Sequence, residues 1–95
     1  MAYKLIVTER ADELIDKLTG YLIFQLNNTP AAIHFLDELN EIYVRLKENP
    51  FQFSKSKDDY LFRKEYREAL LSEMNYRVIF RVEKEMIYVV GVFHF

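Results

Sequence analysis

Four side chains in the last twenty residues have types that could do chemistry together: Arg77, Arg81, Tyr88 and His94. A guanidinium group binds a phosphate or carboxylate through paired hydrogen bonds, and an imidazole transfers a proton near neutral pH. Side chains alternate between the two faces of a β-strand. If residues 76–95 form a hairpin, the four share one face with the apolar residues Ile79, Val90 and Val92. We expect the functional site on this face.

A β-hairpin over residues 76–95 is indicated by two runs of β-branched and aromatic residues around a charged turn. We place Lys84 and Glu85 at the centre of this turn. Arg77 then faces Val92, and His94 is its diagonal neighbour, about 5 to 8 Å away at Cβ. The other face should be buried, and it holds Tyr76, Val78, Phe80, Val82, Ile87, Val89 and Phe93. Lys-Glu is not a preferred turn pair, so a one-residue slip that exchanges the faces stays open.

The rest of the chain predicts the elements that position this hairpin. Residues 2–8 read as a strand covered on both faces, and Thr8 can cap a helix whose apolar stripe runs to residue 26. Thr29 suits the cap of a second helix and Pro30 its first position, and this helix ends at Asn49 and Pro50. The short break between the two helices predicts an αα-hairpin. Residues 51–60 read as a loop.

Residues 62–71 read as a further strand, followed by a turn at residues 72–75. This turn places Leu70 opposite Arg77 and Glu68 opposite Ile79. The predicted fold is α+β with the order β-α-α-β-β-β, in which an αα-hairpin packs on one face of a mainly antiparallel four-stranded sheet. Its final strand is expected to be exposed.

The composition indicates a single globular domain, residues 1–95, because 51% of the residues are hydrophobic and 16% are aromatic. The chain has no cysteine, no secretory signal and no membrane span, so we expect a cytoplasmic protein. The net charge is -2, whereas proteins that grip nucleic acid by its phosphates usually carry a basic excess. Any nucleic-acid contact would need a local basic patch.

Two other polar residues have structural interpretations. His34 lies off the stripe of the second helix and reads as a surface histidine. Two histidines without cysteine or H-x-x-x-H spacing predict no metal site, and no cofactor is expected. Arg67 points to the apolar face opposite Phe80, where it either reaches solvent at the sheet edge or pairs with a helix carboxylate. We favour a structural role for Arg67, although it joins Arg81 and Tyr88 as a candidate binding residue.

Several segments, taken in order, resemble the RelE/ParE superfamily of toxins from bacterial type II toxin–antitoxin modules. They are Y-K-L-I-V-T-E-R-A, N-N-T-P-A-A-I-H-F-L-D-E-L, K-E-N-P, Y-R-E, Y-R-V-I-F-R-V and G-V-F-H-F, and they span nearly the whole chain. The resemblance implies two helices on one face of a mainly antiparallel sheet. It also implies a cognate antitoxin that wraps the toxin and inhibits it.

The superfamily divides by target, and the resemblance points both ways. ParE-like members poison DNA gyrase without a known catalytic site, whereas RelE-like and YoeB-like members cleave mRNA on the ribosome. Arg77 and His94 match positions of the RNA-cleaving members. There Arg77 would stabilise the transition state, His94 would protonate the leaving oxygen, and Glu68 or Glu65 would act as base.

Two departures from the pattern count against cleavage. Phe95 stands where YoeB has a terminal tyrosine, and Glu68 and Leu70 stand where RelE carries lysines. The alternative for Arg77 and His94 is that both are solvated strand residues. We expect a ParE-like toxin that binds an essential target, in a module of the plasmid-stabilisation kind. A ribosome-dependent mRNA endonuclease and an inactive, antitoxin-binding relative remain the alternatives.

Overall fold

The computed structural model describes residues 3–94, so Ala2 in the first predicted strand and Phe95 at the end of the predicted hairpin lie outside the described residues. The chain runs through β1 (Lys4–Val7), α1 (Glu9–Gly20), the π-helical turn η1 (Tyr21–Gln25), α2 (Thr29–Glu48), the 3-10 turn η2 (Pro50–Gln52), α3 (Asp59–Arg63), β2 (Arg67–Leu70), β3 (Tyr76–Glu83) and β4 (Met86–His94). The predicted order is confirmed, with one additional short helix, α3.

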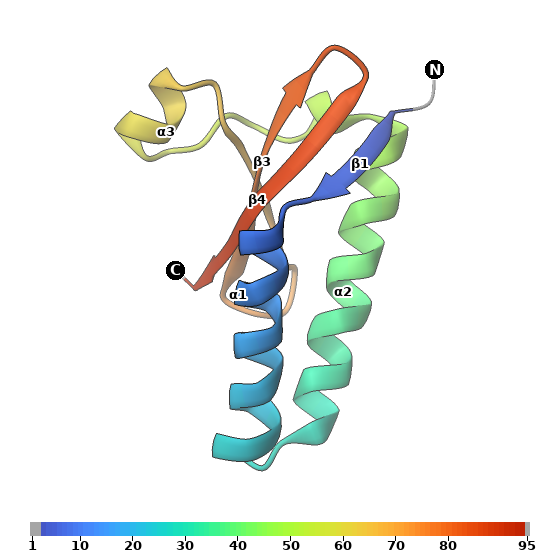
Figure 1. Cartoon of the computed structure of the whole chain (residues 1–95), viewed down its shortest axis with the longest axis vertical. Coiled ribbons are helices and arrows are strands. Elements are labelled where there is room, and N and C mark those ends of the chain that lie inside the picture. Colours follow the sequence, from blue (N-terminus) through green and yellow to red (C-terminus); the bar gives the residue numbers. More distant parts are fainter. Residues whose placement is uncertain (1–2, 95) are drawn as a thin grey trace.

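The four strands form one sheet in the order β1-β4-β3-β2. β1 is parallel to β4, and the other neighbours are antiparallel. The helices α1 and α2 lie side by side, and α3 lies apart from them (Figure 1). The predicted α+β fold, with its helical hairpin packed on the sheet, is confirmed. Across residues 3–94, no helix combines the length and the apolarity needed to cross a membrane.

Two predictions about the strands are wrong. β4 lies between β1 and β3, so the last strand is an inner strand and not an exposed one. β1 is an edge strand, and Ile6 in it is 40% exposed, so β1 is not covered on both faces. Leu5 and Val7, on the other face of β1, are partly buried against the core.

Capping side chains start both long helices. The Thr8 hydroxyl accepts a hydrogen bond from the backbone N–H of Ala11 at 3.2 Å, as predicted. The second helix is capped one residue earlier than expected, because Asn28 and not Thr29 accepts a backbone N–H, at 3.1 Å. Asn27 has a left-handed φ of 50°, a conformation that asparagine tolerates better than most residues. These two asparagines therefore turn the chain from η1 into α2.

The core lies between the helical pair and the sheet. Its largest fully buried side chains include Phe35 and Leu46 from α2, Phe80 from β3 and Ile87 from β4. Phe35 also meets the ring of Tyr76 edge to face, with 5.2 Å between the centroids. The helix-facing side of β3 therefore begins at Tyr76 and continues through Val78 and Phe80, as the alternation predicts.

A β-bulge at Val90 changes the register of the hairpin halfway along its length. Near the turn, Arg81 lies opposite Tyr88, as the placement of Lys84 and Glu85 predicts. Phe80 then faces Val89, but Ile79 faces Gly91, and Val90 is left as the extra residue. Every side chain of β4 after the bulge consequently lies on the face opposite to the predicted one.

The side chains beyond the bulge correct three expectations. Val92 faces Val78 in the core and is only 2% exposed, whereas it was expected on the outer face. Phe93 faces Arg77 on the outer face and is 43% exposed, whereas it was expected in the core. The predicted pairing of Arg77 with Val92 is therefore wrong.

The segment between α2 and β3 also differs from the expectation. Residues 62–71 were expected in a strand, but Phe62 lies in α3 and the strand comprises only Arg67–Leu70. The Asp58 side chain caps α3 by accepting the backbone N–H of Leu61 at 3.0 Å. The predicted pairing of Glu68 with Ile79, and of Leu70 with Arg77, is confirmed.

Candidate functional site

A groove of about 460 Å³ lies on the face of the sheet that the helical pair leaves open. The floor comes from β3 and β4, and the wall comes from α3 and the residues that follow it. The lining residues are Tyr60, Leu61, Lys64, Tyr66, Ile79, Arg81, Val90 and Phe93. Ile79 is only 2% exposed although it points away from the main core, because these neighbours cover it.

Two cations and three aromatic rings line this groove. The Arg81 guanidinium lies 5.9 Å from the centre of the Tyr66 ring, and the Lys64 ammonium lies 5.8 Å from the Tyr60 ring. Arg81 also lies 3.8 Å from a carboxylate oxygen of Glu83 at the exposed rim. A groove with exposed rings beside cations can bind an anionic or planar group.

Arg77 lies beside this groove and contacts a buried carboxylate. Its Nη1 is 3.4 Å from Oε1 of Glu68, a side chain that is only 5% exposed. The same oxygen accepts hydrogen bonds from the Ser56 hydroxyl at 3.1 Å and from the backbone N–H of Lys57 at 3.2 Å. Glu68 therefore holds the loop before α3 against β2, and Arg77 is oriented by this network.

His94 lies on the other side of the sheet from Arg77. It faces Tyr76, with 5.3 Å between the ring centroids, and Tyr76 packs against Phe35 of α2. Directly opposite residues share a face, so His94 belongs to the helix side. Arg77 is the next residue after Tyr76 and points the other way. The expected proximity of Arg77 and His94 is therefore wrong, and the bulge at Val90 is the reason.

The candidate binding residues occupy three different settings. Arg81 lines the groove, as expected from its place on the outer face. Tyr88 is its half-buried cross-strand neighbour. Arg67 faces Phe80 as predicted, but pairs with no carboxylate among residues 3–94; it donates to the Phe53 carbonyl oxygen at 2.7 Å and lies 5.0 Å from the Phe51 ring.

Sequence analysis did not name five residues of the groove as part of the site: Tyr60, Leu61, Lys64, Tyr66 and Phe93. Tyr60 and Leu61 lie in α3, a helix that was not predicted. Lys64 and Tyr66 were assigned to a strand whose register put them on the open face, but neither was selected as a site residue. The signal was present in the run Y-L-F-R-K-E-Y, which interleaves aromatic and basic residues. His34, expected to be a plain surface residue, lies 3.1 Å from Glu73 and 3.6 Å from Glu38.

The structure is a small α+β domain with a helical pair on one face of the sheet and a groove on the other. The family model for the ParE toxin of the type II toxin–antitoxin system, parDE, matches residues 5–94. The chain therefore belongs to the ParE toxin family. A comparison with curated proteins finds no match.

Three solved structures share this fold at low sequence identity. The chromosomal ParDE toxin–antitoxin system from P. aeruginosa matches with a TM-score of 0.79 and 17% identity, over 98% of this chain and 96% of that chain. The RelBE2 toxin–antitoxin complex from Mycobacterium tuberculosis matches with a TM-score of 0.62 and 18% identity, over 100% of both chains. A conserved hypothetical protein from Helicobacter pylori matches with a TM-score of 0.54 and 19% identity, over 99% of this chain and 94% of that chain.

Proposed function

We propose that this protein is the toxin of a type II toxin–antitoxin module and that it stops growth by binding an essential cytoplasmic target. We favour binding over catalysis because Arg77 and His94 lie on opposite faces of the sheet. A phosphodiester cleavage site needs its donor and its acid within reach of one phosphate. DNA gyrase is the target that we test first, because the chain belongs to the ParE family.

The groove on the open face is the proposed contact surface for this target. Its aromatic rings and apolar floor supply buried area, and Arg81 and Lys64 supply positive charge on a chain whose net charge is -2. Aromatic and arginine side chains dominate the binding energy of many protein interfaces. Glu68 is ill suited to act as a base there, because its side chain is only 5% exposed and its Oε1 already accepts hydrogen bonds from three donors.

An antitoxin partner is the second part of the proposal, and the helical pair supports it. Six large apolar side chains are exposed on η1, on the turn after it and on α2: Tyr21, Phe24, Leu26, Ile33, Leu36 and Val44. Phe24 is 82% exposed. A groove of about 260 Å³ also lies where α1 meets α2, lined in part by Leu36, Leu39 and Tyr43. Such surfaces suit a partner that lays an amphipathic helix into a groove.

The target is tested with the purified chain in a DNA supercoiling assay with gyrase. The parent chain should inhibit supercoiling, and the double variant Arg81→Ala with Tyr66→Ala should inhibit at least tenfold less well. Lys17→Ala is the matched control, since it also removes an exposed cation, from the last turn of α1. Induced expression of the parent chain and of Lys17→Ala should stop growth, and the double variant should stop it less well.

The result that would replace this proposal is cutting of mRNA on programmed ribosomes, abolished by Arg77→Ala, while supercoiling stays unaffected. The chain would then be a ribosome-dependent endonuclease. Unimpaired growth on induction, together with tight antitoxin binding, would identify an inactive relative instead.

The antitoxin is tested by co-expression with the product of the neighbouring reading frame. The two chains should co-purify and growth should recover. Phe24→Asp should weaken the complex at least tenfold, because a charge would enter an apolar contact. Phe62→Asp on α3 is the control, since it places the same charge on an exposed aromatic position away from the helical pair. Equal weakening by both variants would contradict this docking surface.

A further inference from the structure

Three side chains with metal-ligating atoms meet where α2 approaches the turn between β2 and β3. They are His34 and Glu38, one helical turn apart on α2, and Glu73 from the turn. His34 Nε2 lies 3.1 Å from Oε2 of Glu73 and 3.6 Å from Oε1 of Glu38. The three ligand atoms all lie within 4.8 Å of one another.

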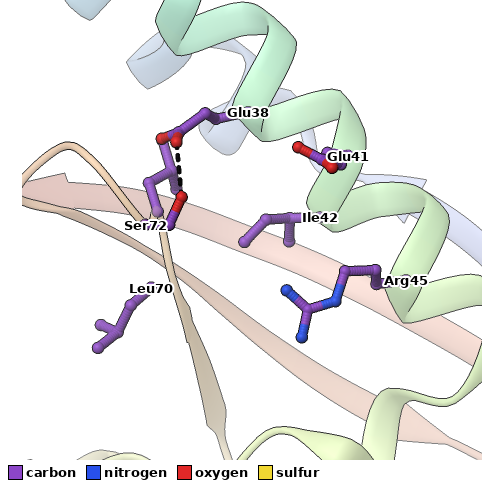
Figure 2. A pocket seen from close by; sticks show the side chains of 7 residues that line it. Glu38, Glu41, Ile42, Arg45, Leu70 and Ser72 are labelled. Atoms are coloured by element: carbon purple, nitrogen blue, oxygen red, sulfur yellow. Dashed lines mark hydrogen bonds between the residues drawn. The ribbon is translucent and has the colours of Figure 1, made fainter.

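Glu38 is the unusual member of this group, because its side chain is only 9% exposed. Its Oε1 accepts hydrogen bonds from the Ser72 hydroxyl at 2.8 Å and from the backbone N–H of Glu73 at 3.3 Å. Its Oε2 is buried and has no hydrogen-bond partner among residues 3–94. Figure 2 shows the Glu38 carboxylate pointing from α2 towards Ser72, which lies beside Glu73 in the turn between β2 and β3. A buried carboxylate oxygen without a partner is unfavourable unless a donor or a cation satisfies it. The oxygen that lies 3.6 Å from His34 is Oε1, so an ion held there would reach Oε2 as the second oxygen of the same carboxylate.

We propose that His34, Glu38 and Glu73 bind a divalent transition-metal ion of the Zn²⁺ class. Zinc binds imidazole nitrogen and carboxylate oxygen at about 2.0 to 2.2 Å in a tetrahedron, which puts ligand atoms about 3.3 to 3.6 Å apart. The separations of 3.1 Å and 3.6 Å at His34 lie within about 0.2 Å of that range. The contacts of His34 therefore need little movement to enclose an ion, and no two ligand atoms of the cluster are more than 4.8 Å apart.

The surroundings favour this class of ion over others. An imidazole ligand suits zinc and its neighbours in the first transition row, whereas Mg²⁺ and Ca²⁺ prefer sites made of oxygen alone. His34 and Glu73 are solvent-accessible, with side chains that are 44% and 72% exposed, so a water molecule can take the fourth position. Ser72 and the backbone N–H of Glu73 orient the Glu38 carboxylate, as outer hydrogen bonds do at metal sites.

Binding would link the middle of α2 to the turn that leads into β3. Because the unfolded chain does not bring these residues together, the ion should stabilise the folded state. The site lies on the helical side of the molecule, away from the groove that holds Arg81 and Tyr66. It therefore adds a property that the proposed target binding does not require.

The test is a calorimetric titration of the metal-free full-length chain with Zn²⁺, accompanied by thermal unfolding with and without the ion. The expected result is one ion bound per chain and a raised Tm. His34→Gln and Glu73→Gln should each weaken binding at least tenfold and abolish the rise in Tm. Both positions are solvent-accessible, so these variants should fold, whereas changes at the buried Glu38 carry a greater risk of unfolding.

Asp37→Asn is the matched control, because it removes one negative charge from the adjacent position of α2 without changing a ligand. It should bind Zn²⁺ like the parent chain. A flat titration and an unchanged Tm would overturn the proposal, and would mean that the cluster is only an ion pair with water in the adjacent cavity of about 40 Å³, which Glu38 and Ser72 also line. Binding that survives both His34→Gln and Glu73→Gln would overturn it equally.

Discussion

His94 meets Tyr76 edge to face across the β3–β4 hairpin, with 5.3 Å between the ring centroids and 77° between the ring planes. This contact places the imidazole on the helix side of the sheet, where Tyr76 already touches Phe35. The single extra residue at Val90 is responsible, because it reverses the direction of every later side chain of β4. One bulge thus separates the two groups that the sequence pattern would bring together.

The contact between Gly91 and Phe93 predicts a coupled effect on stability. A Cβ atom at position 91 would lie 2.4 Å from a ring carbon of Phe93, so the ring would have to move. Gly91→Ala should lower the free energy of unfolding by about 1 kcal/mol or more, as overpacking does. In a Phe93→Ala background the same change should cost much less. Urea denaturation of the four chains of this double-mutant cycle measures the coupling, and equal costs in both backgrounds would contradict the contact.

The hydrogen bonds of Glu68 predict that its accepting oxygen contributes more to folding stability than its negative charge does. Glu68→Ala leaves the Ser56 hydroxyl and the backbone N–H of Lys57 without their acceptor, and should cost about 1 to 3 kcal/mol for each group left buried and unsatisfied. Glu68→Gln keeps an acceptor and should cost clearly less. Glu85→Ala, in the exposed β3–β4 turn, is the control and should change stability by less than about 0.5 kcal/mol. If Glu68→Gln proves as harmful as Glu68→Ala, the charge is the stabilising feature instead.

Two phenylalanines of the helical pair should differ sharply in their effect on folding. Phe35 is fully buried against the sheet, so Phe35→Ala should lower the free energy of unfolding by about 3 to 5 kcal/mol. Phe24 is 82% exposed, so Phe24→Ala should change it by less than about 0.5 kcal/mol. Chemical denaturation monitored by circular dichroism measures both. Near-equal losses would place Phe24 in the core.

Tyr43 predicts a loss of stability at alkaline pH. Burial of the phenol, and secondly the negative charge of Asp12, raise the pKa of Tyr43 from 10.0 to about 12. The unfolded chain has the ordinary pKa, so between these two values the folded state holds a proton that the unfolded state has lost. The contribution of Tyr43 is therefore complete below pH 10 and disappears as the pH rises towards 12.

The variant Tyr43→Phe isolates this effect. Its unfolding free energy should fall less steeply than that of the parent between pH 10 and pH 12. Near neutral pH the variant should be as stable as the parent or more stable, because the buried hydroxyl has no hydrogen-bond partner among residues 3–94. Tyr60→Phe on the exposed surface of α3 is the control and should retain the parent's pH dependence. Identical curves for Tyr43→Phe and the parent would contradict the prediction.

Local signals in the sequence were enough for the two long helices, the four strands and their order, but not for α3, whose residues were assigned to a loop and a strand. The capping position of Thr8, the apolar stripes of the two long helices and the period-two pattern from Tyr76 onward are read from neighbouring residues alone. The pairing of Glu68 with Ile79 also followed, because a short turn sets the register close to it. The resemblance to the toxin superfamily rested on the same linear order, and the family match over residues 5–94 bears it out.

Tertiary structure decided which side chains from distant parts of the sequence contact one another. A bulge at Val90 is favoured by packing on both faces at once, since it puts Val92 into the core and the Phe93 ring against Gly91. No local pattern records that balance. The same holds for the contact between Glu73 and His34, which lie 39 positions apart in the chain (73 minus 34). They meet only because the β2–β3 turn packs against α2. Sequence determined the two long helices and the order of the strands, because those preferences are local. The groove and the His34 cluster depend on contacts that exist only after the segments have packed.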